Sequence, residues 1–166
     1  MKKIITTILL GVLCLSLCAC NTKNIVSNTM EDVTNKTFSL GEKAEIDDVE
    51  VTMVDVYEST GEAFSKPADG NVYVICEFNI ENNSSKDLTV SSMLSFEAYC
   101  DDSSCNLSIS AMASNSEKKQ LDGKIAPGKK LSGIIGYEVP ADWSNMEIRY
   151  TPDPLKDDEV VFVATK

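Results

Sequence analysis

Six cysteines provide most of the reactive side chains in this 166-residue chain, and Cys14, Cys18 and Cys20 lie within seven residues of one another. This spacing could indicate a metal site, a disulfide cluster or a point of covalent attachment. Two lysines at the start and an uncharged apolar run over residues 4–17 favour attachment. The run is shorter than the about 20 residues that cross a bilayer, and a basic start before a short apolar stretch is typical of a secretory signal peptide. Metal ligands are expected on folded loops instead.

Residues 17–20, Leu-Cys-Ala-Cys, resemble the processing box of bacterial lipoproteins. The resemblance implies cleavage after Ala19 and a diacylglyceryl group, carrying palmitate-like chains, on the sulfur of Cys20. Two acyl chains hold a protein stably at a bilayer, whereas one chain is marginal. The sequence therefore predicts a signal peptide over residues 1–19 and attachment to the outer side of a bacterial cell membrane.

The chain is acidic, with 15 basic and 26 acidic side chains and a formal net charge of −11. Removing residues 1–19 would take away two basic residues and leave a net charge of −13. A nucleic-acid partner is disfavoured, because phosphate contacts need Lys and Arg. The same charge disfavours lying flat on an anionic membrane surface.

Residues 20–36 form the predicted lipidated cysteine and a tether, since they are polar and lack a sustained period. From residue 37 to residue 166 the sequence favours β-structure in one domain. Residues 49–57 are dense in β-branched side chains, and their alternation slips at Met53 and Val54, as at a β-bulge or in a strand covered on both faces.

Clean alternation over residues 71–83 places apolar side chains on one face of a strand: Val72, Val74, Cys76, Phe78 and Ile80. Residues 126–129, Ala-Pro-Gly-Lys, are a strong turn signal before a strand whose inward positions are Leu131, Gly133, Ile135, Tyr137 and Val139. Further strands are expected near residues 94–100, 105–110, 146–152 and 159–165. The pattern predicts an all-β fold, an antiparallel β-sandwich of seven to nine strands.

Several of these segments together resemble the telokin-like, immunoglobulin-like domain family of bacterial and archaeal lipoproteins. The shared features are a strand ending in Glu-Asn-Asn at 81–83, a Leu/Phe segment, Ala-Pro-Gly-Lys at 126–129, a Gly-bearing strand and Val-Pro at 139–140. The family is known mainly as a domain of unknown function, and secreted mycobacterial immunoprotective antigens are its relatives. The resemblance implies an immunoglobulin-like sandwich over roughly residues 38–165 and carries over no functional residues.

Catalytic chemistry has little support in the sequence. The chain contains no His, so the usual general base and the Ser–His and Cys–His arrangements are excluded. No Gly-rich phosphate loop joins a strand to a helix. We therefore expect no enzyme activity and no cofactor.

Cys100 and Cys105 flank the tetrapeptide Asp-Asp-Ser-Ser and are predicted to form a disulfide across a hairpin. A redox-active pair and a pair of reduced thiols are the alternatives. Cys76 is expected to be a buried free thiol, with pairing to Cys100 across the core as its alternative.

Acidic clusters could bind Ca²⁺, but none has the spacing of a calcium loop. No metal site is predicted, and the best of the weak candidates is the C-terminal cluster of Asp153, Asp157, Asp158 and Glu159. The aromatic candidates for recognition are Tyr57, Tyr73, Tyr99, Tyr137, Tyr150 and Trp143. Tyr73 and Tyr99 fall on the faces opposite the core, where they could form a patch or pack across neighbouring strands.

These observations favour a membrane-anchored, extracytoplasmic lipoprotein whose sandwich is a non-enzymatic binding module. Its partner would be an envelope protein, a peptide or a glycan. The alternative is an extracytoplasmic carrier that binds a ligand or Ca²⁺ through acidic loops.

Overall fold

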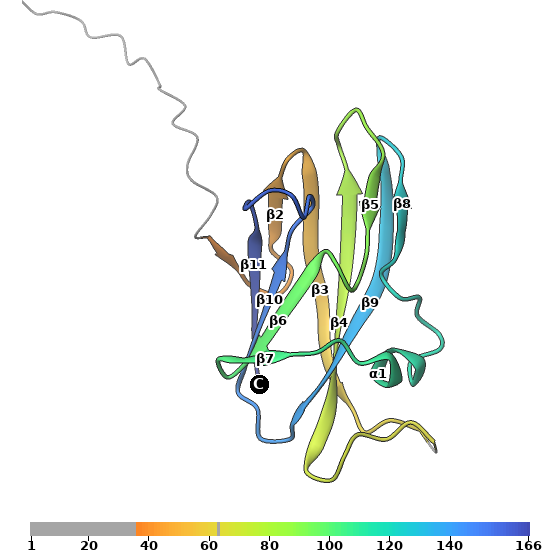
Figure 1. The fold of residues 1–166 in the computed structure, drawn as a ribbon, viewed down its shortest axis with the longest axis vertical. Helices are drawn as coiled ribbons and strands as arrows, with labels where there is room; N and C mark the ends of the chain where they lie inside the picture. Colours follow the sequence, from red (N-terminus) through yellow and green to blue (C-terminus); the bar gives the residue numbers. More distant parts are fainter. Residues whose placement is uncertain (1–35, 63) are drawn as a thin grey trace, which may run out of the picture.

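The computed structural model describes residues 36–62 and 64–166, which form two packed β-sheets (Figure 1). One sheet has the strand order β1-β11-β10-β6-β7, the other has the order β2-β3-β4-β9, and β5 and β8 pair as a separate ribbon. The strands are β1 (Thr37–Phe38), β2 (Lys43–Ile46), β3 (Val49–Ser59), β4 (Asn71–Asn82), β5 (Leu88–Val90), β6 (Phe96–Cys100), β7 (Ser103–Cys105), β8 (Gly123–Ile125), β9 (Lys129–Pro140), β10 (Asn145–Tyr150) and β11 (Val160–Thr165).

The predicted β-sandwich of seven to nine strands is confirmed: in the described residues its two sheets hold five and four strands, and β5 and β8 form the additional ribbon. Four of the strands, β1, β5, β7 and β8, have only two or three residues each. Pairing is antiparallel between neighbouring strands, apart from the parallel pair β1–β11. Strands of this length are too short to show an alternation of apolar and polar residues in the sequence, and their pairing depends on the neighbouring strands.

The predicted β-bulge is present in β3, where the register against β4 shifts between Met53 and Asp55. A bulge adds one residue to one strand and bends it. The slip in alternation at this point therefore has a structural cause.

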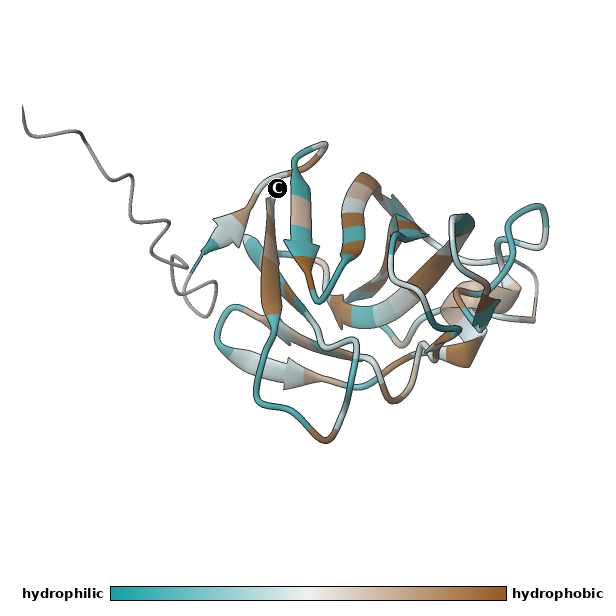
Figure 2. Ribbon diagram, turned by 90° about the horizontal axis from the view of Figure 1, so that it is seen from above, coloured by the Kyte–Doolittle hydropathy of each residue, from teal (hydrophilic) through white to brown (hydrophobic). Residues whose placement is uncertain are grey.

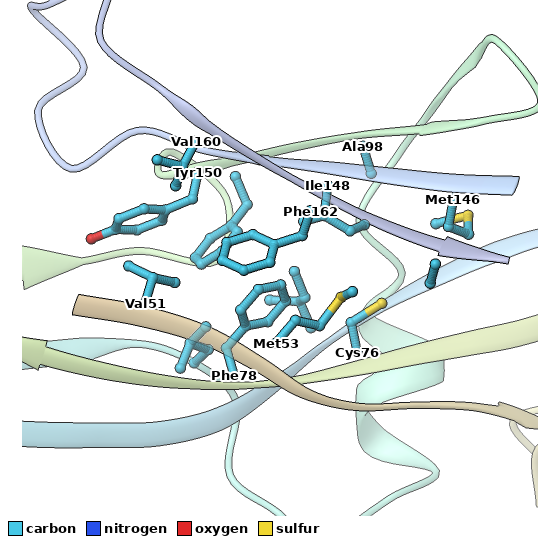
Figure 3. Close-up of a cluster of buried hydrophobic side chains, with 14 of the residues drawn as sticks. Val51, Met53, Cys76, Phe78, Ala98, Met146, Ile148, Tyr150, Val160 and Phe162 are labelled. Carbon is cyan, nitrogen blue, oxygen red and sulfur yellow. The ribbon is translucent and has the colours of Figure 1, made fainter. Parts of the chain in front are cut away.

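Aromatic and aliphatic side chains from both sheets fill the space between them. Figure 3 shows Phe78 of β4 and Phe162 of β11 pointing toward one another, and their ring centroids lie 5.4 Å apart. The rings of Phe96 and Tyr150 extend the cluster at 5.0 Å. The predicted inward faces of β4 and β9 are confirmed, and Cys76 is fully buried among them.

A second, smaller core lies on the outer face of β4 and β9, beneath the short helix α1 (Ile109–Ala113) (Figure 2). Ala111 and Met112 of the helix cover Tyr73 and Ile75 of β4. Tyr73 faces away from the main core, as predicted, but it is only 1% exposed, because it packs beneath the helix and forms no surface patch. In the part of the chain that the structure describes, no helix is long and apolar enough to cross a membrane.

Candidate functional site

One sheet edge is left half open, and it is the best candidate for a functional site. In its N-terminal half β3 pairs with β2, where Val49 lies opposite Ile46 and Thr52 lies opposite Lys43. The N–H of Gly41 then donates to the carbonyl oxygen of Met53 at 2.8 Å. Within residues 36–62 and 64–166, no strand pairs with the same side of β3 at residues 54–59.

The other long edge of this sheet, formed by β9, is covered over its middle residues. The segment after β7 follows β9 closely: Ser108 N–H donates to the Gly136 carbonyl at 2.7 Å, and Ile134 N–H donates to the Lys119 carbonyl at 2.8 Å. Leu121 N–H in turn donates to the Ile134 carbonyl at 3.0 Å. The free part of β3 therefore differs from the covered edge of β9.

The backbone polar groups that face this opening follow from the register. In an antiparallel pair, successive residues direct their N–H and C=O groups alternately toward and away from the partner. Met53, paired with Phe78, faces away from β4, because its carbonyl accepts from Gly41. Cys76 lies two residues before Phe78 in β4 and pairs with Val56, so the N–H and C=O groups of Val56 also face the opening. The same holds two residues later for Glu58, which pairs with Val74.

Beside this edge lies a hollow that we call the edge groove, with a volume of about 580 Å³. It separates the free part of β3 from the end of β11 and from the loop between β9 and β10. Leu40, which is 50% exposed, stands at its rim. Its lining consists of Ser39, Leu40, Val56, Tyr57, Glu58, Trp143, Val163, Ala164, Thr165 and Lys166.

Glu58 is held in the edge groove by two partners. Its Oε1 accepts from the indole Nε1 of Trp143 at 2.7 Å and forms an ion pair with Lys166 Nζ at 2.6 Å. The hydrogen bonds from Lys166 and Trp143 lower the pKa of Glu58. Lys166 is also 5.8 Å from the centroid of the Trp143 ring. Glu58 is therefore ionised at neutral pH and fixes the orientation of the indole.

Little in the sequence indicates the edge groove. Trp143 is one of six aromatic candidates, and the β-bulge lies at the point where the edge of β3 becomes free. Of the other aromatics, Tyr73, Tyr137 and Tyr150 are buried. Tyr57 donates to Asn115 Oδ1 at 3.2 Å, and Tyr99 lies 5.2 Å from the Arg149 guanidinium, so both pack against neighbours rather than form a joint patch.

Cys100 and Cys105 line a separate hollow of about 520 Å³. The tight loop between β6 and β7 has only two residues, Asp101 and Asp102, rather than the four expected. Cys105 therefore pairs with Ala98 and lies diagonally from Cys100 on the same face. Both are free thiols in this structure. Burial, with the Cys105 thiol nearby, raises the pKa of Cys100 to about 11.

The C-terminal acidic cluster is not assembled into a ligand set. Asp153 lines a hollow with Asp47 and Asp48, whereas Asp157 and Glu159 line a different one. Glu159 accepts from Arg149 at 3.0 Å. Among the described residues, no group of three or more acidic or cysteine side chains is positioned to hold a metal ion.

The predicted signal peptide (1–19), the lipidated Cys20 and nearly all of the tether (20–36) lie outside the described residues. They therefore stay predictions. The strands of the sandwich run from Thr37 to Thr165.

Fold and groove together define a small β-sandwich protein with one half-open edge. The chain belongs to the family described as "Domain of unknown function (DUF4352)", which matches residues 38–160. No curated protein matches the sequence.

Solved structures share the fold at low identity. The lipoprotein candidate YcdA of Bacillus subtilis is 20% identical with a TM-score of 0.63, covering 74% of this chain but only 38% of YcdA. YjhA of Bacillus subtilis is 17% identical with a TM-score of 0.57, covering 75% of this chain and 96% of YjhA. An uncharacterized β-sandwich protein of Clostridium difficile is 17% identical with a TM-score of 0.51, covering 78% of this chain and 94% of that one.

Proposed function

We propose that this protein is a lipid-anchored, extracytoplasmic binding module without enzyme activity, and that the edge groove is its binding surface. The observation that carries the proposal is the free edge of β3 beside a mostly apolar hollow. Exposed sheet edges are ready templates for pairing, and folded proteins usually cover them. In residues 36–62 and 64–166, the middle of β9 and the first half of β3 are covered, whereas residues 54–59 have no partner on their outer side.

Attachment to the membrane is supported by the lipoprotein-like box that ends at Cys20. The similarity to YcdA, itself a lipoprotein candidate, agrees with this placement. The telokin-like, immunoglobulin-like resemblance also agrees with a domain displayed outside the cell. We propose an envelope protein, a peptide or a glycan as the partner.

The anchor is tested by changing Cys20 to Ser and separating membranes from soluble material. We expect the variant to leave the membrane fraction, because the acyl chains provide the attachment. A variant that stays with the membranes would show that the lipoprotein assignment is wrong.

The binding surface is tested on intact cells with a photocrosslinking amino acid at Val54, which is 36% exposed at the free edge. The control places the same amino acid at Asp157, an exposed position in the loop between β10 and β11. We expect a specific partner to be captured from position 54 and not from position 157. Equal capture from both positions would contradict the assignment of the groove.

A further inference from the structure

We propose that the edge groove binds an extended peptide, which adds to β3 as a further strand and presents alternating apolar and basic side chains. This inference rests on the proposed function and names the chemistry of the partner. Its backbone would pair with β3, its apolar side chains would enter the groove, and its basic side chains would meet an acidic edge.

The backbone of β3 supplies the first part of the match. The N–H and C=O groups of Val56 and Glu58 face the opening, as the register with Cys76 and Val74 requires. Strand addition satisfies such groups through main-chain hydrogen bonds, which give affinity independent of sequence. The free segment of six residues spans about 20 Å, enough for a peptide of the same length.

The groove supplies an apolar site for alternate side chains. Val56 is half-buried and packs against the main core, so the inner side of the edge is apolar at this point. Leu40 at the rim and Val163 of β11 line the same hollow. Because side chains of an added strand alternate between its two faces, every second residue would reach this lining.

Charge determines which side chains are favoured at the other positions of the peptide. Asp55 is exposed at the free edge and makes no ion pair within the described residues. Glu58, on the groove side of the same edge, is already paired with Lys166, so the attraction rests on Asp55 and on the net charge of −11 of the whole chain. Basic side chains on the peptide would therefore be attracted to this edge, most strongly at low salt.

The same charges argue against a second copy of this chain as the occupant. An antiparallel pair of two β3 edges would place the Asp55 carboxylates of the two copies on the same face and near one another. Like charges opposite one another destabilise strand pairing. Charged side chains on an edge are a common protection against self-association.

The test uses the full chain carrying Cys20→Ser and the fluorescence of Trp143, the single tryptophan, which lines the groove. The probe is the blocked peptide Lys-Val-Lys-Val-Lys-Val. Its controls are Glu-Val-Glu-Val-Glu-Val and the block sequence Lys-Lys-Lys-Val-Val-Val, which keeps the composition of the probe without its alternation. We expect a saturable change with the probe and binding at least about ten-fold weaker for either control, a difference of about 1.4 kcal/mol.

Two variants locate the site. Asp55→Lys should weaken the probe at least about five-fold through charge repulsion, whereas the matched control Asp157→Lys should bind it as the parent does. Glu58→Pro removes an edge N–H that β4 does not use and should abolish binding, since proline is tolerated on edge strands. Circular dichroism checks that each variant is folded. If Glu58→Pro does not fold, the Asp55→Lys result tests the site by itself.

Three outcomes would overturn the inference. The first is the absence of a saturable response to the probe. The proposed function would still stand in that case if the crosslinker at position 54 captures a partner on cells. A second is equal binding of the block peptide, which would indicate general charge attraction. The third is a concentration-dependent dimer that Glu58→Pro abolishes, which would make a second copy the occupant.

Discussion

At the scale of single residues, Asn82 joins two loops that lie far apart in the sequence. Its side-chain N–H groups donate to the carbonyl oxygens of Lys86 at 2.7 Å and Ile125 at 2.8 Å. Its Oδ1 accepts from the Ser84 hydroxyl at 2.7 Å, and its main-chain oxygen accepts from Gly128 N–H at 2.7 Å. The Glu-Asn-Asn and Ala-Pro-Gly-Lys segments that carry the family resemblance therefore meet in space, and their role is structural.

Replacing Asn82 with Ala should lower the free energy of unfolding by about 1–3 kcal/mol, because buried carbonyl groups would lose their donors. Asn83, the exposed neighbour, is the matched control, and Asn83→Ala should change stability by less than about 0.5 kcal/mol. Urea titrations of both variants provide the measurement. Equal losses would show that the Asn82 side chain makes no special contribution.

The buried thiol of Cys76 should be unreactive while the sandwich is folded. Burial raises the pKa of Cys76 to about 12, and the thiolate is the reactive form. In a chain whose three N-terminal cysteines are changed to serine, alkylation of Cys76 at pH 8 should be at least about 100-fold slower than in urea. Mass spectrometry at timed intervals measures the rates, and rapid alkylation of native Cys76 would contradict its burial.

The predicted disulfide between Cys100 and Cys105 is tested on the same chain. Incubation with oxidised glutathione should remove two hydrogens from the protein and release two molecules of reduced glutathione. Cys76 would then be the one thiol left to react after unfolding. Three reactive thiols after this treatment would show that the diagonal pair does not close.

At the scale of elements, two glycines allow the segment after β7 to cover β9. A Cβ at Gly133 would lie 2.8 Å from the Lys119 carbonyl oxygen and 2.9 Å from the Leu121 Cα. A Cβ at Gly136 would instead meet side-chain atoms, the Ala111 Cβ and the Ile75 Cδ1, each at 2.9 Å. Backbone cannot move aside as easily as the end of a side chain.

Gly133→Ala should therefore destabilise the protein by about 1–3 kcal/mol, the usual cost of overpacking. Gly136→Ala is the matched comparison and should cost less, because the Ile75 side chain can turn away. Thermal unfolding followed by circular dichroism measures both. A larger loss for Gly136→Ala would mean that the helix side of β9 is the tighter one.

Strand alternation predicted the inner faces of β4 and β9 because one side of each strand packs against the opposite sheet. Alternation also placed Tyr73 on the outer face, but it could not predict the burial of Tyr73 there, since the covering helix has five residues and is too short to show a period. The edge groove could not be predicted, because a free edge depends on strand order. That order brings residues 54–59 and residues 163–165 together from distant parts of the sequence.

At the scale of the whole molecule, buried acidic protons make stability depend on alkaline pH. Burial raises the pKa of Cys76 to about 12 and that of Cys100 to about 11, from ordinary values near 9. Burial also raises the pKa values of Tyr137 and Tyr150. The unfolded chain therefore releases these protons at lower pH than the folded chain does.

Stability from these groups should be complete below pH 9 and should fall as the pH rises toward 12. Urea titrations at several pH values measure the slope. In Cys76→Ala the fall should be shallower, because one proton no longer contributes. An unchanged slope would show that the Cys76 thiol does not couple folding to pH.

The parallel pairing of β1 with β11 has a mechanical consequence. Any pull on the chain before Thr37 enters the sandwich through two residue pairs, Thr37–Val161 and Phe38–Phe162, and through the contact of two phenylalanine rings 5.6 Å apart. This short strand pair is the first contact in the sandwich to bear the tension. Its release would carry Ser39 and Leu40 away from the groove that they line. We therefore expect a force on the N-terminal segment to change the structure of the open edge before it affects the rest of the sandwich.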